Sequence, residues 1–169
     1  KDPFPRSGDA PGRSAPRPGP GCDPSSMSQS SPVIGPAGTT GPVGVVVSRM
    51  RALAAVLPER DGVAVFNRVY LTVTEDLDRR LGAGEFPDPR AAAALDVRFA
   101  ERYLAAIDAA EADLRPPACW RPLFQLRHHP HVRPLQFALA GVNAHIGHDL
   151  ALAVVDACRT VGCEPADLA

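Results

Sequence analysis

The residues best suited to chemistry lie together in one short segment, Asn143-Ala144-His145-Ile146-Gly147-His148-Asp149. His145 and Asp149 are four residues apart, so on a helix their side chains can touch. An imidazole and a carboxylate so placed could hold a divalent metal ion, given ligands from another helix, and His148 is a further candidate ligand. They could instead act as a general base, with Asp149 orienting His145.

A third interpretation of the same residues needs no ligand. Amide and charged groups are costly to bury unpaired, so Asn143, His145 and Asp149 could form a buried polar network that holds neighbouring helices in register. We take this network, without an assignable activity, as the leading hypothesis. The two alternatives are a metal-dependent, hydrolase-type enzyme that uses His145 and Asp149, and a small-molecule-binding helical module. Possible partners on other helices are Glu75, Asp76, Asp96 and Glu101.

Complete catalytic motifs are absent from the sequence. It contains no Glu-x-x-His, His-Glu-x-x-His or Gly-x-Ser-x-Gly motif, and its glycines lack phosphate-binding spacing. No cofactor is therefore predicted, with a divalent metal ion as the alternative.

The four cysteines, without a Cys-x-x-Cys pair, are expected to be free thiols. The histidines between residues 128 and 131 are expected to lie in a solvated loop, with weak metal binding as the alternative. The cysteines are Cys22, Cys119, Cys158 and Cys163, and the loop histidines are His128, His129 and His131.

Helical segments must position these residues. Between residues 1 and 43 lie ten of the nineteen prolines and seven of the fourteen glycines, which predicts a disordered tail. The rest, 44–169, is rich in good helix formers and is expected to be one helical domain. Asp61-Gly62 and Asp88-Pro89 are typical of helix starts. The expected helices cover 45–57, 62–81, 89–114, a short stretch around Trp120 to Leu126, and 134–161.

Apolar periodicity predicts which faces are buried. Val65, Val69, Val73 and Leu77 recur every four residues, with Phe66 and Tyr70 beside them, and indicate one helical face. A second face, in the helix that follows, is formed by Leu95, Phe99, Tyr103 and Ile107. The segment 134–161 is apolar over most of its circumference, as is typical of a buried central helix. The fold class predicted is therefore all-α, with about five helices in an irregular bundle around that helix.

Charge and hydropathy narrow the classes of partner. The net charge is −1, and the sequence lacks the basic stripe that nucleic-acid binding needs. No stretch reaches the roughly 18 consecutive apolar residues of a membrane span, and the N-terminus lacks an apolar signal-peptide region. We therefore expect no nucleic-acid partner, no membrane partner and a cytoplasmic location. A small-molecule or protein partner stays open.

Four stretches in this order resemble a bacterial family catalogued as domain-of-unknown-function family 5995. They are the segments 66–74, 86–89, 95–104 and 136–150, and the most specific is the string Asn-Ala-His-Ile-x-x-Asp-Leu at 143–150. Members usually follow it with Leu-Pro-Leu, where this chain has Leu-Ala-Leu at 150–152. They also usually continue past the equivalent of Ala169, so the resemblance implies a domain that is incomplete at its C-terminus. It implies an all-helical fold, no established activity, and four positions of interest: Asn143, His145, Asp149 and Asp96, the last joining His145 and Asp149 as a catalytic candidate.

Overall fold

The computed structural model describes residues 41–168, and the structural statements that follow refer to this part of the chain. It is helical and contains no strand within these residues, which confirms the predicted all-α class. The disordered tail expected over 1–43 lies almost wholly outside the described residues. The helices are α1 (Pro42–Val56), α2 (Gly62–Gly82), α3 (Pro89–Glu111), α4 (Arg121–Leu126), α5 (Pro134–Ala144) and α6 (Leu150–Val161). Short 3₁₀ turns are η1 (Ala118–Trp120) and η3 (Pro165–Leu168), and a π-helical segment, η2 (His145–Asp149), joins α5 to α6.

Both predicted helix starts carry the expected caps. The Asp61 side chain accepts hydrogen bonds from the backbone N–H groups of Val63 and Ala64 at the start of α2. Asp88 accepts one from Ala91 at the start of α3, where Pro89 occupies the first turn. Side-chain oxygens thus satisfy donors that a helix N-terminus leaves without intrahelical partners.

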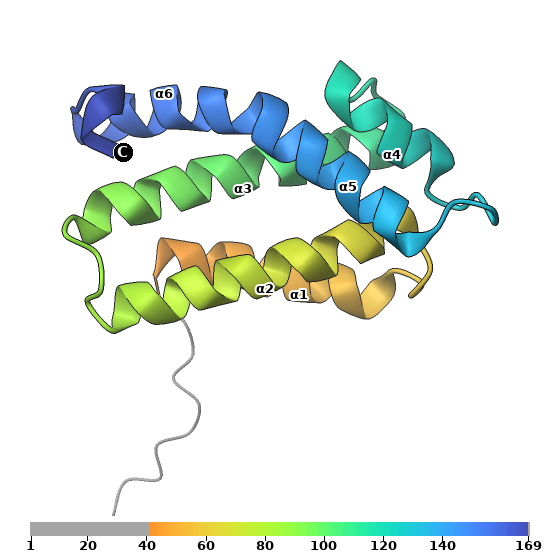
Figure 1. Cartoon of the computed structure of the whole chain (residues 1–169), viewed down its shortest axis with the longest axis horizontal. Coiled ribbons are helices and arrows are strands. Elements are labelled where there is room, and N and C mark those ends of the chain that lie inside the picture. Colours follow the sequence, from red (N-terminus) through yellow and green to blue (C-terminus); the bar gives the residue numbers. More distant parts are fainter. Residues whose placement is uncertain (1–40, 169) are drawn as a thin grey trace, which may run out of the picture. The chain divides into compact units, whose positions relative to one another are not determined.

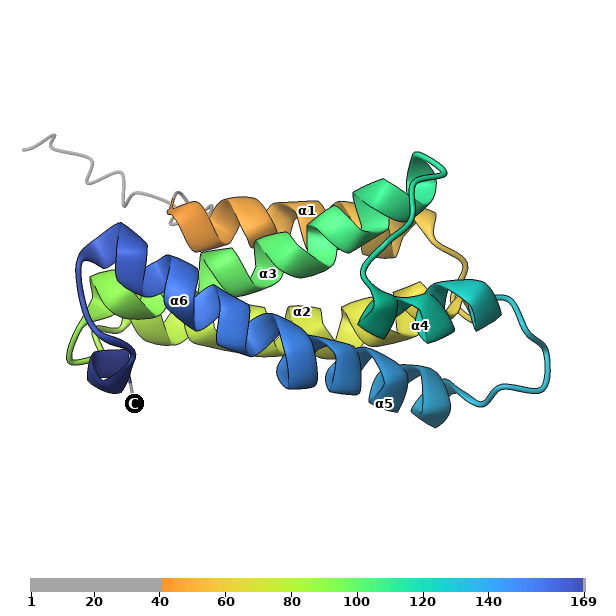
Figure 2. The same ribbon diagram turned by 90° about the horizontal axis from the view of Figure 1, so that it is seen from above.

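The long helix formed by α5, η2 and α6 lies along two different neighbours (Figures 1 and 2). Its α6 half packs against α3, and its α5 half packs against α2, while α1 packs against α2 and α3. Aromatic and aliphatic side chains fill the space between these helices. The largest wholly buried ones are Trp120, Tyr103, Phe66, Met50 and Ile107.

The crossing of α2 and α5 depends on two glycines. A Cβ atom on Gly62 would come within 2.6 Å of the Phe137 ring, and one on Gly141 would overlap the Phe66 ring. Each phenylalanine therefore packs directly on the backbone of the opposite helix. This close approach brings η2, which follows α5, into the core.

The helix at 134–161, expected to be central and largely buried, is central, but its burial is confined to one face. Only one face is buried, formed by Phe137, Gly141 and Ala144 in α5 and by Ala153 and Ala157 in α6. The large apolar residues of the opposite face are exposed: Leu135, Leu139, Val142 and Ile146. Of the face predicted for α2, Val65, Phe66 and Tyr70 are buried, whereas Val69 and Val73 are exposed.

The π turn changes the register between the two halves of this helix. An α-helix turns about 100° per residue, and η2 holds one residue more than an α turn would. The backbone N–H of Leu150 accordingly bonds to the carbonyl of His145, five residues back. The α6 side chains are therefore rotated by about 100°, relative to those of α5, from the positions that one continuous α-helix would give them.

The segment Pro134–Val161 is also the one helix in the described part of the chain that is long and apolar enough to cross a membrane. That criterion uses length and composition only, and core helices of bundles meet it as well. The packing of α5 on α2 and of α6 on α3 covers one side of this helix and leaves its other side exposed.

Candidate functional site

The carboxylate of Asp149, which is 2% exposed, is the centre of a polar cluster in the core. Its Oδ2 accepts a hydrogen bond of 2.9 Å from the indole N–H of Trp120. The Nδ1 atom of His145 lies 3.2 Å from the same oxygen, and Nδ1 of His148 lies 2.8 Å from Oδ1. One buried acid thus gathers three donors, from η1 and from its own π turn.

These contacts determine the protonation states of His145 and Asp149. Burial would raise the pKa of Asp149, but hydrogen bonds from His145, His148 and Trp120 together hold that pKa below its ordinary value. Burial lowers the pKa of His145, although Asp149 opposes this shift. The pair is therefore a carboxylate beside a neutral imidazole. Because the carboxylate only accepts hydrogen bonds, the His145 proton sits on Nδ1 and leaves Nε2 with a free lone pair.

An aromatic cage encloses the imidazole of His145. The Phe99 ring stacks on it with centroids 3.5 Å apart and planes 5° from parallel. Tyr70 lies edge-on at 4.4 Å, and Phe66 and Trp120 each lie at 5.9 Å. Nε2 is buried without a hydrogen-bond partner among the residues that the structure describes. His145 could act as a base only if the side chains around Nε2 moved apart.

A pocket of about 470 Å³ opens on the other side of Phe99. Side chains of α2, of α3 and of the turn between them line it, with Leu150 from the start of α6. The apolar members include Val73, Leu77, Phe86, Leu95 and Phe99, and the polar members are Tyr70, Asp88 and Asp96. In size and in its mostly apolar lining the pocket is typical of small-molecule sites.

Two residues that line this pocket each have a buried polar atom with unused hydrogen-bonding capacity. The Oη of Tyr70 and the Oδ2 of Asp96 are both buried, and neither has a partner within residues 41–168. Burial, and then the nearby Asp78 carboxylate, raise the pKa of Asp96 to about 7. Asp96 therefore changes its charge close to neutral pH.

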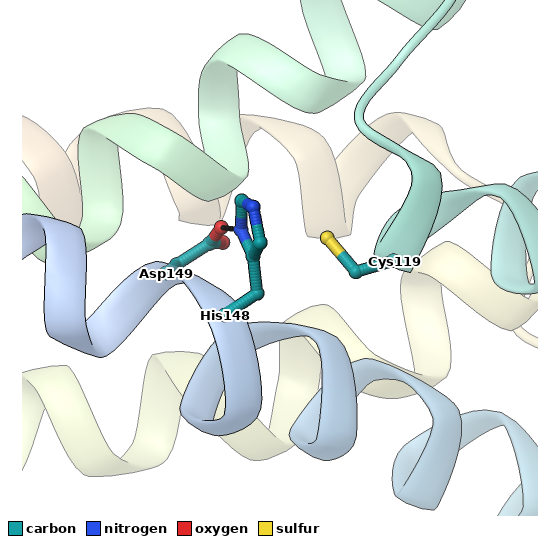
Figure 3. A group of neighbouring side chains, drawn as sticks. All are labelled: Cys119, His148 and Asp149. Carbon is teal, nitrogen blue, oxygen red and sulfur yellow. Dashed lines mark hydrogen bonds and ion pairs between the residues drawn. The ribbon is translucent and has the colours of Figure 1, made fainter.

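A second group of side chains, Cys119 and His148, meets at Asp149 (Figure 3). Ligating atoms of Cys119, His148 and Asp149 all lie within 4.8 Å of one another. Of the three residues predicted as metal ligands, His148 and Asp149 belong to this group. Cys119, expected only to be a free thiol, takes the place that the prediction gave to His145.

The structure brings together some of the predicted site residues and separates others. His145, His148 and Asp149 form one cluster, whereas Asp96 lines the pocket beyond Phe99. Asn143 is exposed and lies outside the buried network proposed for it. The acids Glu75, Asp76 and Glu101 pair with Arg51, Arg79 and Arg98 respectively, and not with His145 or Asp149.

Sequence reasoning missed the residues that complete both sites. Trp120, expected in the short helix, lies in the 3₁₀ turn directly before α4 and was not recognised as a partner of Asp149. Tyr70 and Phe99 appeared only as apolar face residues. One signal could have found Trp120, because a buried indole N–H needs an acceptor and this chain has a single tryptophan.

Comparison with known proteins adds a family but no activity. A family model described as "Family of unknown function (DUF5995)" matches residues 43–169. No curated protein and no solved structure matches the chain.

Proposed function

Since the chain belongs to this family of unknown function, its own geometry must indicate its role, and we propose that it binds a small apolar molecule carrying an amine. The pocket between α2 and α3 is the proposed site. The observation that carries the proposal is that Asp96, which lines a mostly apolar cavity, has a buried Oδ2 without a hydrogen-bond partner in the described part of the chain.

An unpaired buried acceptor costs about 1–3 kcal/mol, and a ligand that donates a hydrogen bond to it recovers this cost. The Oη of Tyr70 offers a second polar contact in the same wall. The surrounding apolar side chains would cover the rest of the ligand. A few convergent polar groups in a mostly apolar cavity are what orient a small molecule.

The charges around the pocket favour a cation over an anion. Asp88 and Asp96 line it, and Asp78 is close enough to raise the pKa of Asp96. None of the lining residues within the described part of the chain is a lysine or an arginine. The Arg80 guanidinium, paired with Glu85, lies 5.3 Å from the centroid of the Phe86 ring, so that ring already carries one cation. The Phe99 ring adds an aromatic face to the lining, and such faces attract ammonium groups.

A matched pair of probes tests the proposal: 4-phenylbutylamine and 4-phenylbutyrate, titrated into the full chain by calorimetry. The amine should bind and the acid should bind at least tenfold more weakly, which corresponds to about 1.4 kcal/mol. Asp96→Asn should remove this preference. Binding of the amine should also strengthen about tenfold from pH 6 to pH 8, because Asp96 ionises over that interval.

Glu111→Gln, which neutralises an exposed acid at the end of α3, is the matched control and should keep the preference. Equal affinity for amine and acid, or a preference that survives Asp96→Asn, would contradict the proposal. So would the absence of binding by either probe.

A further inference from the structure

Three side chains with metal-ligating atoms meet where η1 approaches the π turn. Cys119 comes from η1, and His148 and Asp149 are consecutive residues of η2 (Figure 3). We propose that Cys119, His148 and Asp149 bind a single divalent transition metal ion, with zinc the best match to their donor atoms. This site is separate from the pocket and does not rest on the proposed function.

The spacing of the three groups fits a tetrahedral ion after a small adjustment. Zinc bonds of 2.0–2.3 Å place neighbouring ligand atoms about 3.3–3.6 Å apart. Here Nδ1 of His148 and Oδ1 of Asp149 are 2.8 Å apart, and all three ligating atoms lie within 4.8 Å of one another. A shift of about 1 Å in the Cys119 and His148 side chains suffices.

The donor set selects the class of metal. A thiolate, an imidazole nitrogen and a carboxylate oxygen together suit zinc, whereas magnesium and calcium prefer oxygen ligands throughout. Three protein ligands leave a fourth position for water or a substrate atom, as in catalytic zinc sites. The His148 side chain is 46% exposed, so the ion has a path from solvent. On binding, the ion displaces the Cys119 thiol proton, which passes to solvent. The proton that His148 shares with Asp149 moves to the Nε2 atom of His148 by exchange with water, so that His148 ligates through Nδ1 as a neutral imidazole.

The buried side of Asp149 is already held in the way that metal-binding carboxylates usually are. Its Oδ2 accepts from Trp120 and His145, which leaves Oδ1 directed towards His148. Such outer contacts orient a ligand and raise affinity for the metal. His145 is therefore a positioning residue at this site.

The π turn is a second, independent feature that favours a site here. Consecutive residues of an α-helix point about 100° apart and do not face each other. In η2 the side chains of His148 and Asp149 are nevertheless hydrogen-bonded to each other. Single π turns occur mostly inside helices at functional positions.

Cobalt, a zinc substitute with visible spectra, gives the sharpest test. The full chain is stripped of metal with a chelator, dialysed and titrated with Co²⁺, then with Zn²⁺ in competition. The expected result is one ion per chain, a thiolate-to-cobalt charge-transfer band, and displacement of cobalt by zinc. Cys119→Ala should abolish the band, and His148→Ala should lower zinc affinity about 100-fold. Neither side chain is in the buried core, so both variants should fold.

Matched controls exclude other ligands of the same types. Cys163→Ala and Cys22→Ala should retain the band, and His129→Ala with His131→Ala should retain the affinity. His145→Gln should bind 10- to 100-fold more weakly while the band persists, as expected of a positioning residue. Asp96→Asn should leave zinc binding unchanged. A band that survives Cys119→Ala, affinity unaffected by His148→Ala, or no stoichiometric binding would each overturn the proposal.

Discussion

Asp96 is an acid whose protonation depends on the fold. It is 6% exposed, and burial followed by the Asp78 charge raises its pKa to about 7, from roughly 3.9 in an unfolded chain. The folded state therefore prefers the protonated form. Its contribution to stability is fully present below the unfolded pKa and is lost as the pH rises through about 7.

Asp96→Asn should accordingly remove a pH dependence of stability. Between pH 4 and pH 8 the wild-type chain should lose at most about 4 kcal/mol through this group, and the variant should not. Urea unfolding at pH 4, 6 and 8 measures the difference. Glu111→Gln should behave like the wild type. Parallel pH profiles for wild type and Asp96→Asn would show that this carboxyl group has an ordinary pKa.

The Asp149 cluster shows which site residues the sequence can predict. His145 and Asp149 share one helix turn, so their contact follows from local spacing. The contact with Trp120 joins residues 29 positions apart, and no local pattern encodes it. The same holds for Cys119, because its approach to His148 depends on how η1 docks against η2. Local geometry therefore predicts the contact of His145 with Asp149, whereas the contributions of Trp120 and Cys119 depend on tertiary packing.

At the scale of elements, local signals predicted the helices well and their faces poorly. Caps such as Asp61 and Asp88 act within one turn, so the starts of α2 and α3 could be read directly. Burial of a face depends on the neighbours that a helix meets. The π turn between α5 and α6 added a second obstacle, since the two halves present different registers to α2 and α3.

The α2–α5 crossing gives a prediction that separates packing from helix propensity. Gly141→Ala should destabilise the chain by about 1–3 kcal/mol, because its Cβ would overlap the Phe66 ring in a packed core. Gly147→Ala, with nothing within 4 Å of its added Cβ, should be neutral or stabilising by up to about 1 kcal/mol.

Thermal unfolding of both glycine variants, followed by circular dichroism, checks this pair. Both variants replace glycine by alanine, so most of the effect of helix propensity cancels between them. The difference between their melting temperatures therefore reports the packing of α5 against α2. Equal melting temperatures would mean that α2 and α5 are not in the close contact described.

For the domain as a whole, the exposed apolar face of α5 is the feature that sequence reasoning assigned to the core. Leu135 is 68% exposed and Leu139 is 52% exposed, whereas Phe137 between them is 4% exposed. Burial releases free energy only when apolar area leaves water, so the two leucines contribute little to the bundle.

The double variant Leu135→Glu and Leu139→Gln should therefore unfold within about 0.5 kcal/mol of the wild type. Phe137→Ala should cost about 3–5 kcal/mol, because it leaves a cavity over Gly62. Urea titration of the three proteins measures both effects. Large destabilisation by the double variant would place the leucine face in the core after all.

The hydrogen bond from Trp120 to Asp149 also has a spectroscopic consequence. Trp120 is the sole tryptophan of the chain, is fully buried, and donates its indole N–H to the carboxylate shared with His145 and His148. Indole fluorescence responds to polarity and to nearby charge, so its emission should report a change of charge or ligation at Asp149. The protein thus carries a label-free optical probe in direct contact with its proposed metal site.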